Sequence, residues 1–226
     1  MITFKYLGLI DYKKAWDYQQ KLFNELINIK KTNRDLPLHK QEELKNYLLF
    51  CEHPPVFTLG KSGSENNLLI NKKTLEKEKI SYYKINRGGD ITFHGPGQIV
   101  GYPILDLENF SLNIREYIYK LEEVIILTLN EYNIKAERLK GATGVWLDSD
   151  ENNETRKICS IGVRISRWIT MHGFAFNVNT NLKYYDLINP CGFTDKAVTS
   201  MEKELGEKQN IQEVKNKLRK YFEKLF

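Results

Sequence analysis

The chain has 226 residues, of which 41% are hydrophobic and 28% are charged, and its 34 Lys and Arg against 29 Asp and Glu give a formal net charge of +5. Its 13 Tyr and 11 Phe exclude a disordered chain, and the lack of any run of 18 apolar residues excludes a membrane-spanning helix. The modest positive charge suits an acidic protein partner or weak nucleic-acid contact, and alone it does not decide between them.

The first part of the chain predicts one helix and two short strands. The helix begins after Asp11, which can cap it, carries apolar residues at three- and four-residue spacing, and ends among residues 30–33. Two separate strands are expected, at 47–51 and 56–59. The two prolines between them have no backbone N–H to donate to a sheet, so they interrupt the strand pattern. A polar loop is expected at 61–67.

The remainder predicts two more helices and the rest of a sheet. One helix runs from about Asn113 to Glu131, where Asn113 and Glu116 resemble a capping box, and the last opens with Asn210. Further strands are expected at 82–86, 98–105, 143–148, 157–165 and 168–179, with a polar hairpin tip at 148–156. No repeat, linker or change in composition divides the chain. We therefore expect one α/β domain over residues 1–226, with helices flanking a mixed sheet.

The cysteines indicate a reducing compartment. Cys51, Cys159 and Cys191 are an odd number in a chain whose first residues match neither a signal peptide nor a transit peptide. We therefore expect free thiols and a cytoplasmic protein. The cysteines and histidines lack the CxxC and HExxH spacings of zinc sites, so no metal is expected. A nucleic-acid-binding module is a weak alternative, because the chain has no basic stripe and no RNA-binding signature.

Residues 87–98 read RGGDITFHGPGQ, with four glycines and a proline between strand patterns. Glycine lets backbone approach a ligand closely, as a loop that wraps a substrate must do. The spacing matches neither GxGxxG nor GxxxxGKS, so it does not indicate a nucleotide site. The alternative is a long turn between two strands.

Cys191 lies in the segment Asn-Pro-Cys-Gly, among turn formers that would expose its sulfur and leave the next backbone N–H free for an oxyanion. A thiol becomes a nucleophile when a nearby cation or base favours the thiolate. The candidates for that group are Lys157, Arg164, Arg167 and His172.

Lys157 is unusual among them because it opens the apolar and small-residue run 158–163. Its side chain could point inward, where burial beside Ile158 and Val163 would lower the pKa of its amine. The alternative is a lysine at a strand end that extends to water, since Lys is rarely buried without a partner.

The blocks RGGDITFHGPGQ, KICSIGVR, HGFAFNVN and INPCG, in this order, closely resemble the lipoyl(octanoyl) transferases, the octanoyltransferase family that begins lipoate assembly. The resemblance extends over residues 45–200 or so. It implies the mixed α/β catalytic fold shared with biotin and lipoate protein ligases. It also implies that Cys191 carries the acyl group and that Lys157 activates it. The acyl pocket that it implies comprises Arg87, Gly88, Gly89, Asp90, Ile91, Thr92, Phe93, His94, Ser160, Ile161, Gly162, Gly173, Phe174 and Ala175.

The resemblance implies a donor and acceptors as well. Octanoyl-acyl carrier protein would load Cys191, and a lysine in lipoyl domains of 2-oxoacid dehydrogenase complexes and of the glycine cleavage H protein would receive the group. Transfer from thioester to amide runs downhill, so no cofactor is expected. Such partners tend to be acidic, and Lys61, Lys72 and Lys140 are candidates for a basic rim, although each is as readily a solvated surface lysine.

ATP-dependent lipoate-protein ligases are the alternative, but they typically have His, Asp and Asn around the glycine-rich loop and lack the cysteine retained here at 191. Phe93 replaces the Tyr common in the family. Phe174 and Phe176 stand where smaller residues are usual, so their bulk is expected to shorten the accepted chain. His94 is expected to be a pocket wall and a possible hydrogen-bond donor, and His172 a structural histidine whose hydrogen bonds are satisfied.

Overall fold

The computed structural model describes residues 1–149, 154–189 and 197–226. Its main sheet has the strand order β1-β2-β6-β10-β9-β8-β7, and β11 pairs with β9. A second sheet has the order β4-β3-β5. The strands are β1 (Ile2–Leu9), β2 (Asn46–Glu52), β3 (Val56–Leu59), β4 (Ser81–Lys84), β5 (Ile91–His94), β6 (Gln98–Ile104), β7 (Glu137–Leu139), β8 (Ala142–Leu147), β9 (Arg156–Ser166), β10 (Ile169–Asn177) and β11 (Ala197–Val198).

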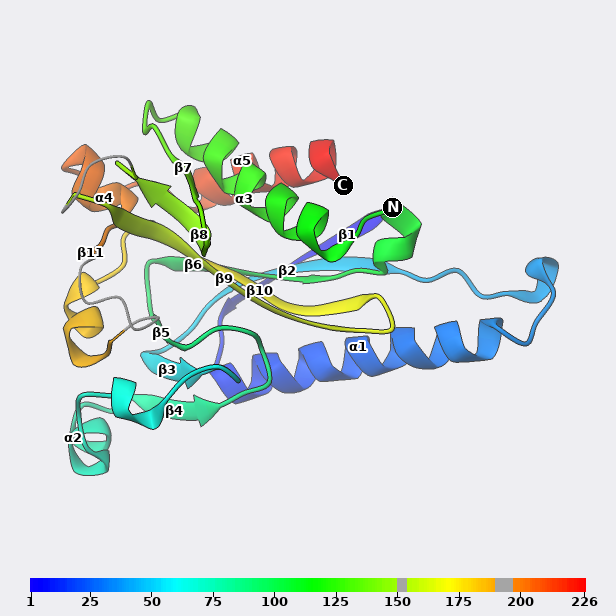
Figure 1. Ribbon diagram of the computed structural model, residues 1–226, viewed down its shortest axis with the longest axis horizontal. Coiled ribbons are helices and arrows are strands. Elements are labelled where there is room, and N and C mark those ends of the chain that lie inside the picture. The colour runs from blue at the N-terminus through cyan, green and yellow to red at the C-terminus, as the bar shows by residue number, and fades with distance from the viewer. Residues whose placement is uncertain (150–153, 190–196) are drawn as a thin grey trace.

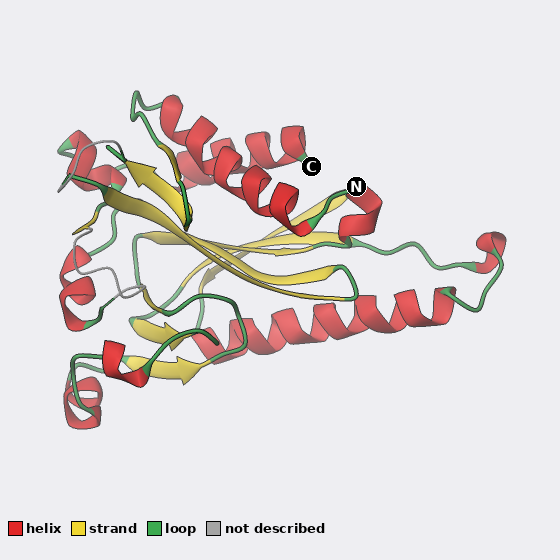
Figure 2. Ribbon diagram, viewed as in Figure 1, coloured by secondary structure: helices red, strands yellow, loops and turns green. Residues whose placement is uncertain are grey.

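Helices cover both faces of the main sheet (Figure 1). On one face lie α3 (Ile114–Asn130) and α5 (Ile211–Leu225), and on the other lie α1 (Tyr12–Asn33) and the second sheet (Figures 1 and 2). The shorter helices are α2 (Lys72–Lys77), α4 (Met201–Leu205) and the 3₁₀ turns η1 (Leu38–Lys40), η2 (Glu65–Asn67), η3 (Leu107–Phe110) and η4 (Leu182–Leu187). In the described ranges, no helix has the length and apolar character needed to cross a membrane.

The three long helices begin at the residues that the sequence indicates. The Asp11 side chain accepts a hydrogen bond from the backbone N–H of Lys14 and caps α1. Asn113 and Glu116 form the expected capping box at the start of α3. Asn210 caps α5 through the first backbone N–H groups of that helix.

Each face of the sheet has its own apolar core. Residues of α3 and α5 such as Leu121 and Leu218 pack with Phe50 of β2 and Val145 of β8. On the other face, Phe23 of α1 and its apolar neighbours cover β6 and β10. A mixed α/β fold is therefore confirmed.

The strand predictions were correct for most of the main sheet, and four strands were missed: β1, β5, β7 and β11. β5 lies inside the glycine-rich segment and pairs antiparallel with β3, from Val56 opposite His94 to Leu59 opposite Ile91. β1 lies at the sheet edge, parallel to β2, and its exposure does not follow a period of two. The expected tip at 148–156 includes residues 150–153, which lie outside the described residues.

Candidate active site

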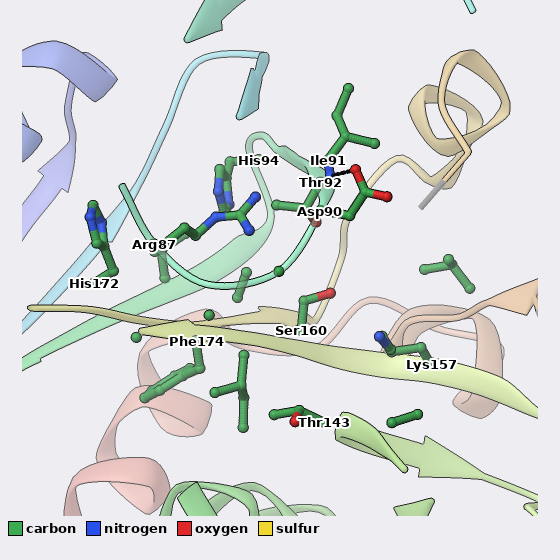
Figure 3. A pocket seen from close by; sticks show the side chains of 18 of the residues that line it. Arg87, Asp90, Ile91, Thr92, His94, Thr143, Lys157, Ser160, His172 and Phe174 are labelled. Atoms are coloured by element: carbon green, nitrogen blue, oxygen red, sulfur yellow. Dashed lines mark hydrogen bonds between the residues drawn. The ribbon is translucent and has the colours of Figure 1, made fainter. Parts of the chain in front are cut away.

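A cavity of about 260 Å³ lies between the main sheet and the segment that carries β5. Its floor comes from β6, β8, β9 and β10, and its other walls come from the start of α1 and from residues 87–94 (Figure 3). Of the expected pocket residues, these line it: Arg87, Gly89, Asp90, Ile91, Thr92, His94, Ser160, Ile161, Gly162, Gly173, Phe174 and Ala175. Lys157 also lines the cavity. Cys191 lies outside the described residues.

Two expected pocket residues take other positions. Phe93 is buried in the core of the second sheet, where its ring stacks on Tyr184 at 4.4 Å between centroids. Gly88 donates its backbone N–H to the carbonyl of Val163 at 2.9 Å and so ties the glycine-rich segment to β9. This close approach explains why residue 162 is a glycine: a Cβ at this position would lie 2.8 Å from the carbonyl oxygen of Gly88.

A β-bulge in β9 brings Lys157 and Ser160 to the same face. Val145 of β8 pairs with Cys159, and the next residue, Trp146, pairs with Lys157, so Ile158 is the extra residue. Residues three apart in a regular strand point to opposite faces, but both Lys157 and Ser160 line the cavity. Ile158 and Cys159 lie in the core beneath α3. The bulge re-aims the amine, as bulges beside active sites commonly do.

The aromatic neighbour of Lys157 is Trp146, its partner across the strands. Lys157 Nζ lies 4.3 Å from the centroid of the Trp146 ring. The ring is 1% exposed, and its indole N–H donates to the carbonyl of Ala142 at 3.0 Å, which fixes its orientation. A ring face stabilises an ammonium ion. The expectation that Ile158 surrounds the amine was wrong, because the bulge turns Ile158 to the other face of the sheet.

His94 belongs to a buried hydrogen-bond network that fixes it as a neutral ring. Its Nδ1 lies 2.9 Å from Gln98 Oε1, and its Nε2 lies 3.3 Å from Thr58 Oγ1. Thr58 Oγ1 in turn accepts a hydrogen bond from Arg87 at 3.0 Å. Burial lowers the pKa of His94 well below its usual value. Both ring nitrogens are therefore engaged with protein groups, and His94 acts as a wall rather than as a donor to a ligand.

We expected both ring nitrogens of His172 to be hydrogen-bonded, but within the described part of the chain only one of them is. Its Nε2 donates to Asn86 Oδ1 at 2.9 Å, and the side chain is 1% exposed. Its Nδ1 has no partner among the described residues. Burial lowers the pKa of His172 to about 3, so the ring is neutral at pH 7 and Nδ1 carries a lone pair.

Two further features define the walls. Asp90 accepts hydrogen bonds from its neighbour's backbone N–H at 2.6 Å and from Asn67 at 2.5 Å, which orders the segment over the cavity. The Phe174 ring lies on the opposite side of the sheet from Arg87, where it meets Phe50, although Phe174 borders the cavity (Figure 3). Phe176 lies in the same core. Phe174 borders the cavity and Phe176 does not, so the expected shortening of the acyl chain stays a prediction for Phe174.

The described thiols are poor nucleophiles. Cys51 and Cys159 are free, and each is fully buried. Burial raises the pKa of both thiols far above the usual value. No cluster of metal-ligating side chains occurs within residues 1–149, 154–189 and 197–226.

Sequence patterns missed several lining residues, among them Tyr12, Tyr102, Trp146 and Tyr185. Trp146 reaches the site only through its pairing with Lys157 across the bulge. Tyr12 reaches it from the first turn of α1, where the pattern predicts burial but not what the residue faces. The one feature of the sequence that could have indicated Tyr12 is its position as an aromatic residue directly after the capping Asp11.

The chain matches the family described as the lipoyl protein ligase A/B catalytic domain over residues 11–223. An octanoyltransferase of Flavobacterium psychrophilum is 58% identical to it, over 97% of this chain and 94% of that protein. One of Christiangramia forsetii is 56% identical over 97% and 93%, and one of Parabacteroides distasonis is 53% identical over all of both chains.

Solved structures share the fold at low sequence identity. P. falciparum LipL1 in complex with lipoate superposes with a TM-score of 0.70 at 14% identity, and the match covers 99% of this chain and 60% of that one. Lipoate-protein ligase A bound with ATP gives a TM-score of 0.66 at 14% identity, over 99% and 84% of the two chains. From the sequence relatives, the chain belongs to the lipoyl protein ligase A/B catalytic domain family and, within it, to the octanoyltransferases.

Proposed function

We propose that this enzyme moves an octanoyl group from octanoyl-acyl carrier protein to a lysine of lipoyl domains through a thioester on Cys191, in the cytoplasm and as the first step of lipoate synthesis. The observation that carries the proposal is Lys157, which the bulge aims into a mostly apolar cavity (Figure 3). Relatives named octanoyltransferases, at 53–58% identity over nearly the whole chain, support the same activity.

The first step exchanges one thioester for another. The Cys191 thiolate attacks the carbonyl carbon of the octanoyl thioester, the bond from that carbon to the carrier's sulfur breaks, and the carrier's thiol leaves with a proton. In the second step a lysine amine of the acceptor attacks the acyl-enzyme, loses a proton and releases the Cys191 thiolate. The second step forms an amide from a thioester and needs no separate energy source.

Lys157 serves both steps in this proposal. As a cation beside Cys191 it favours the thiolate over the thiol. After it gives up its proton to the departing thiol, the neutral amine can accept one from the incoming lysine. The Trp146 ring holds the Lys157 amine in the cavity between these events.

The acyl-enzyme is tested by intact mass after the protein is mixed with octanoyl-acyl carrier protein. We expect the mass to increase by one octanoyl unit and hydroxylamine to remove this increase. In Cys191→Ser no thioester adduct should form. Cys159→Ser is the matched control, since Cys159 is buried in the core and should leave the adduct in place. An octanoyl adduct that persists in Cys191→Ala would contradict the assignment. Transfer that needs added ATP would favour the ligase alternative.

Lys157 is tested by the rate at which iodoacetamide alkylates Cys191 at neutral pH. We expect Lys157→Ala to slow this rate by about tenfold or more, because a neighbouring cation typically lowers a thiol pKa by at least one unit. Lys140→Ala, an exposed lysine near the cavity's Gly141, is the matched control. Equal rates in Lys157→Ala and parent would remove the activating role.

We propose a positively charged docking surface for the acidic partner proteins. Lys61, Lys72 and Lys140 are exposed, as a docking rim for acidic partners requires. Opposite charges on two surfaces speed association in a salt-dependent way. Transfer should therefore slow as salt rises, and a triple replacement of these lysines by Ser should weaken that dependence.

A further inference from the structure

Besides Thr92 Oγ1, two buried polar atoms on residues that line the cavity have no hydrogen-bond partner among the described residues. They are Tyr12 Oη and His172 Nδ1. Tyr12 is 2% exposed and His172 is 1% exposed, and both residues line the cavity. A buried polar atom without a partner is costly, and most such atoms in folded proteins meet a ligand or an ordered water.

His172 is placed there by an unusual backbone. Its φ is +61°, which lies in the left-handed region that only a few per cent of residues other than Gly adopt, His more often than most. Its pairing partner on β9, Val163, packs on the α3 side of the sheet, and regular alternation would send His172 to that side too. Instead the side chain reaches Asn86 on the cavity side. Such strain at a site boundary is commonly tied to function.

The chemistry of His172 restricts what can bind. Its Nε2–H is used by Asn86, so the free Nδ1 of the neutral ring can only accept a hydrogen bond. The ligand atom must therefore donate a proton. A hydroxyl or a water can do this, whereas a methyl group or a carboxylate cannot.

Tyr12 supplies the second half of the subsite. Its ring is stacked between those of Tyr83 and His94, with centroids 5.4 and 5.9 Å away, so its hydroxyl is held in position. Tyr102 offers a contrast in the same cavity, because its hydroxyl lies 2.7 Å from His53 Nε2 and is already used. Tyr12 Oη can donate to or accept from a hydroxyl that also donates to His172.

The position of this pair suits the far end of an acyl chain. Val163, the partner of His172, lies six residues along β9 from Lys157, and because Ile158 is the bulged residue the strand advances by about five steps, or roughly 17 Å. The Lys157 amine points along the sheet toward Ser160 and covers part of that span (Figure 3). The seven carbon–carbon bonds of an octanoyl chain reach at most about 10 Å at about 1.5 Å each. A chain that starts near the Lys157 amine would therefore end close to His172.

We propose that Tyr12 and His172 form a polar end-subsite that binds one neutral hydroxyl, either an ordered water beyond a plain octanoyl chain or a hydroxyl on the terminal carbon of the chain. The subsite then limits chain length by chemistry as well as by volume. A ninth carbon would displace the hydroxyl and leave both polar atoms without a partner. This inference rests on the proposed function, because it identifies the bound chain as an acyl substrate.

The test uses binding of free acids, which requires no transfer. Octanoic, 8-hydroxyoctanoic, nonanoic and octanedioic acids are titrated into the protein by calorimetry. Nonanoic acid matches 8-hydroxyoctanoic acid in size and carries a methyl group in place of the hydroxyl. We expect 8-hydroxyoctanoic acid to bind about tenfold more tightly than nonanoic acid. Octanoic acid that binds as well as 8-hydroxyoctanoic acid identifies a water as the occupant, and weaker binding of octanoic acid identifies the chain's own hydroxyl.

Tyr12→Phe and His172→Asn should each reduce the preference for hydroxyl over methyl to less than about threefold. Asn is chosen because it tolerates the left-handed backbone at 172. Tyr102→Phe is the matched control: it removes a hydroxyl from the same cavity that is already bonded to His53, so the preference should persist even if stability falls. Circular dichroism checks that each variant is folded.

Equal binding of 8-hydroxyoctanoic and nonanoic acids would overturn the subsite. So would a preference that persists in both Tyr12→Phe and His172→Asn, or tightest binding by octanedioic acid, which would indicate an anion site near Arg87. Failure of the proposed function is distinguishable. If octanoyl transfer to a lipoyl domain is absent but the hydroxyl preference follows Tyr12 and His172, the subsite stands and the transfer proposal falls.

Discussion

Trp146 is the aromatic neighbour of the Lys157 amine in the cavity. Its face lies against Lys157 Nζ at 4.3 Å, and its own N–H is fixed by the Ala142 carbonyl. Cation–π contacts contribute roughly 0.5–2 kcal/mol, more when the pair is away from water. The ring therefore favours the ammonium form of Lys157 and holds it at one position.

Replacement of Trp146 by Leu should remove this contact, whereas Trp146→Phe keeps a ring face. We expect Trp146→Leu to move the pH profile of octanoyl transfer toward lower pH, because the amine then loses its proton more readily, and to lower kcat by several-fold. The Phe variant should retain most of the parent profile. A loss of activity without any change in the pH profile would mean that Trp146 only packs.

At the level of single residues, the sequence indicated the chemistry but not its surroundings. Lys157 was singled out as a charge beside an apolar run, and it does line the cavity. What surrounds its amine was predicted wrongly, since alternation in a strand cannot reveal a bulge at Ile158. His172 was expected to be satisfied because its positive φ, which turns the ring toward Asn86, has no signature in the sequence.

Among the elements, the long helices were predictable because their caps are local. The Asn113–Glu116 box joins residues three apart and depends on nothing distant. β5 was not predictable, because its four residues lie among glycines and become a strand only through pairing with β3. β1 is an edge strand whose burial lacks the alternation that identifies strands.

The cap of α3 offers a test at this scale. Asn113→Ala removes the acceptor for the Glu116 backbone N–H, and we expect the free energy of unfolding to fall by about 1 kcal/mol. Octanoyl transfer should be unchanged, because α3 covers one face of the main sheet and the segment with β5, which borders the cavity, lies on the other (Figure 1). Urea unfolding measures the change, and Asn113→Ser, which can still cap, should recover most of it. No change in Asn113→Ala would show that packing alone defines the helix start.

For the whole molecule, buried histidines connect stability to pH. Burial lowers the pKa of His53 to about 4 and that of His172 to about 3, and it lowers the pKa of His94 as well. In the unfolded chain each would titrate near 6.5. Between these values the unfolded chain binds protons that the folded chain does not. Stability is therefore complete above about pH 6.5 and is lost as the pH falls toward 4.

We expect urea unfolding at pH 7, 6 and 5 to show a decreasing free energy of unfolding, by up to about 1.4 kcal/mol per pH unit for each buried histidine. His53→Gln should reduce this slope. His39→Gln is the control, because His39 is exposed. A flat profile from pH 7 to 5 would contradict the neutral assignment of these rings.

The general architecture was within reach of the sequence, and the precise cavity was not. Periodic apolar faces and caps predict the helices that cover the sheet. The cavity depends on how β9 meets β8, β10 and the glycine-rich segment, and those contacts join residues far apart in the chain. Single-sequence patterns carry little information about such pairings.

The extra residue at Ile158 has a consequence for protein engineering. From Cys159 onward β9 keeps an unbroken register with β10, so removal of Ile158 would leave that hairpin intact. The same deletion would leave Lys157 two residues from Ser160 and still opposite Trp146, so in the resulting regular strand its amine would keep facing the cavity. Ile158 is therefore the one position of β9 at which a residue can be removed without reversing the faces of its neighbours, whereas a deletion elsewhere in the strand would turn one part of it over.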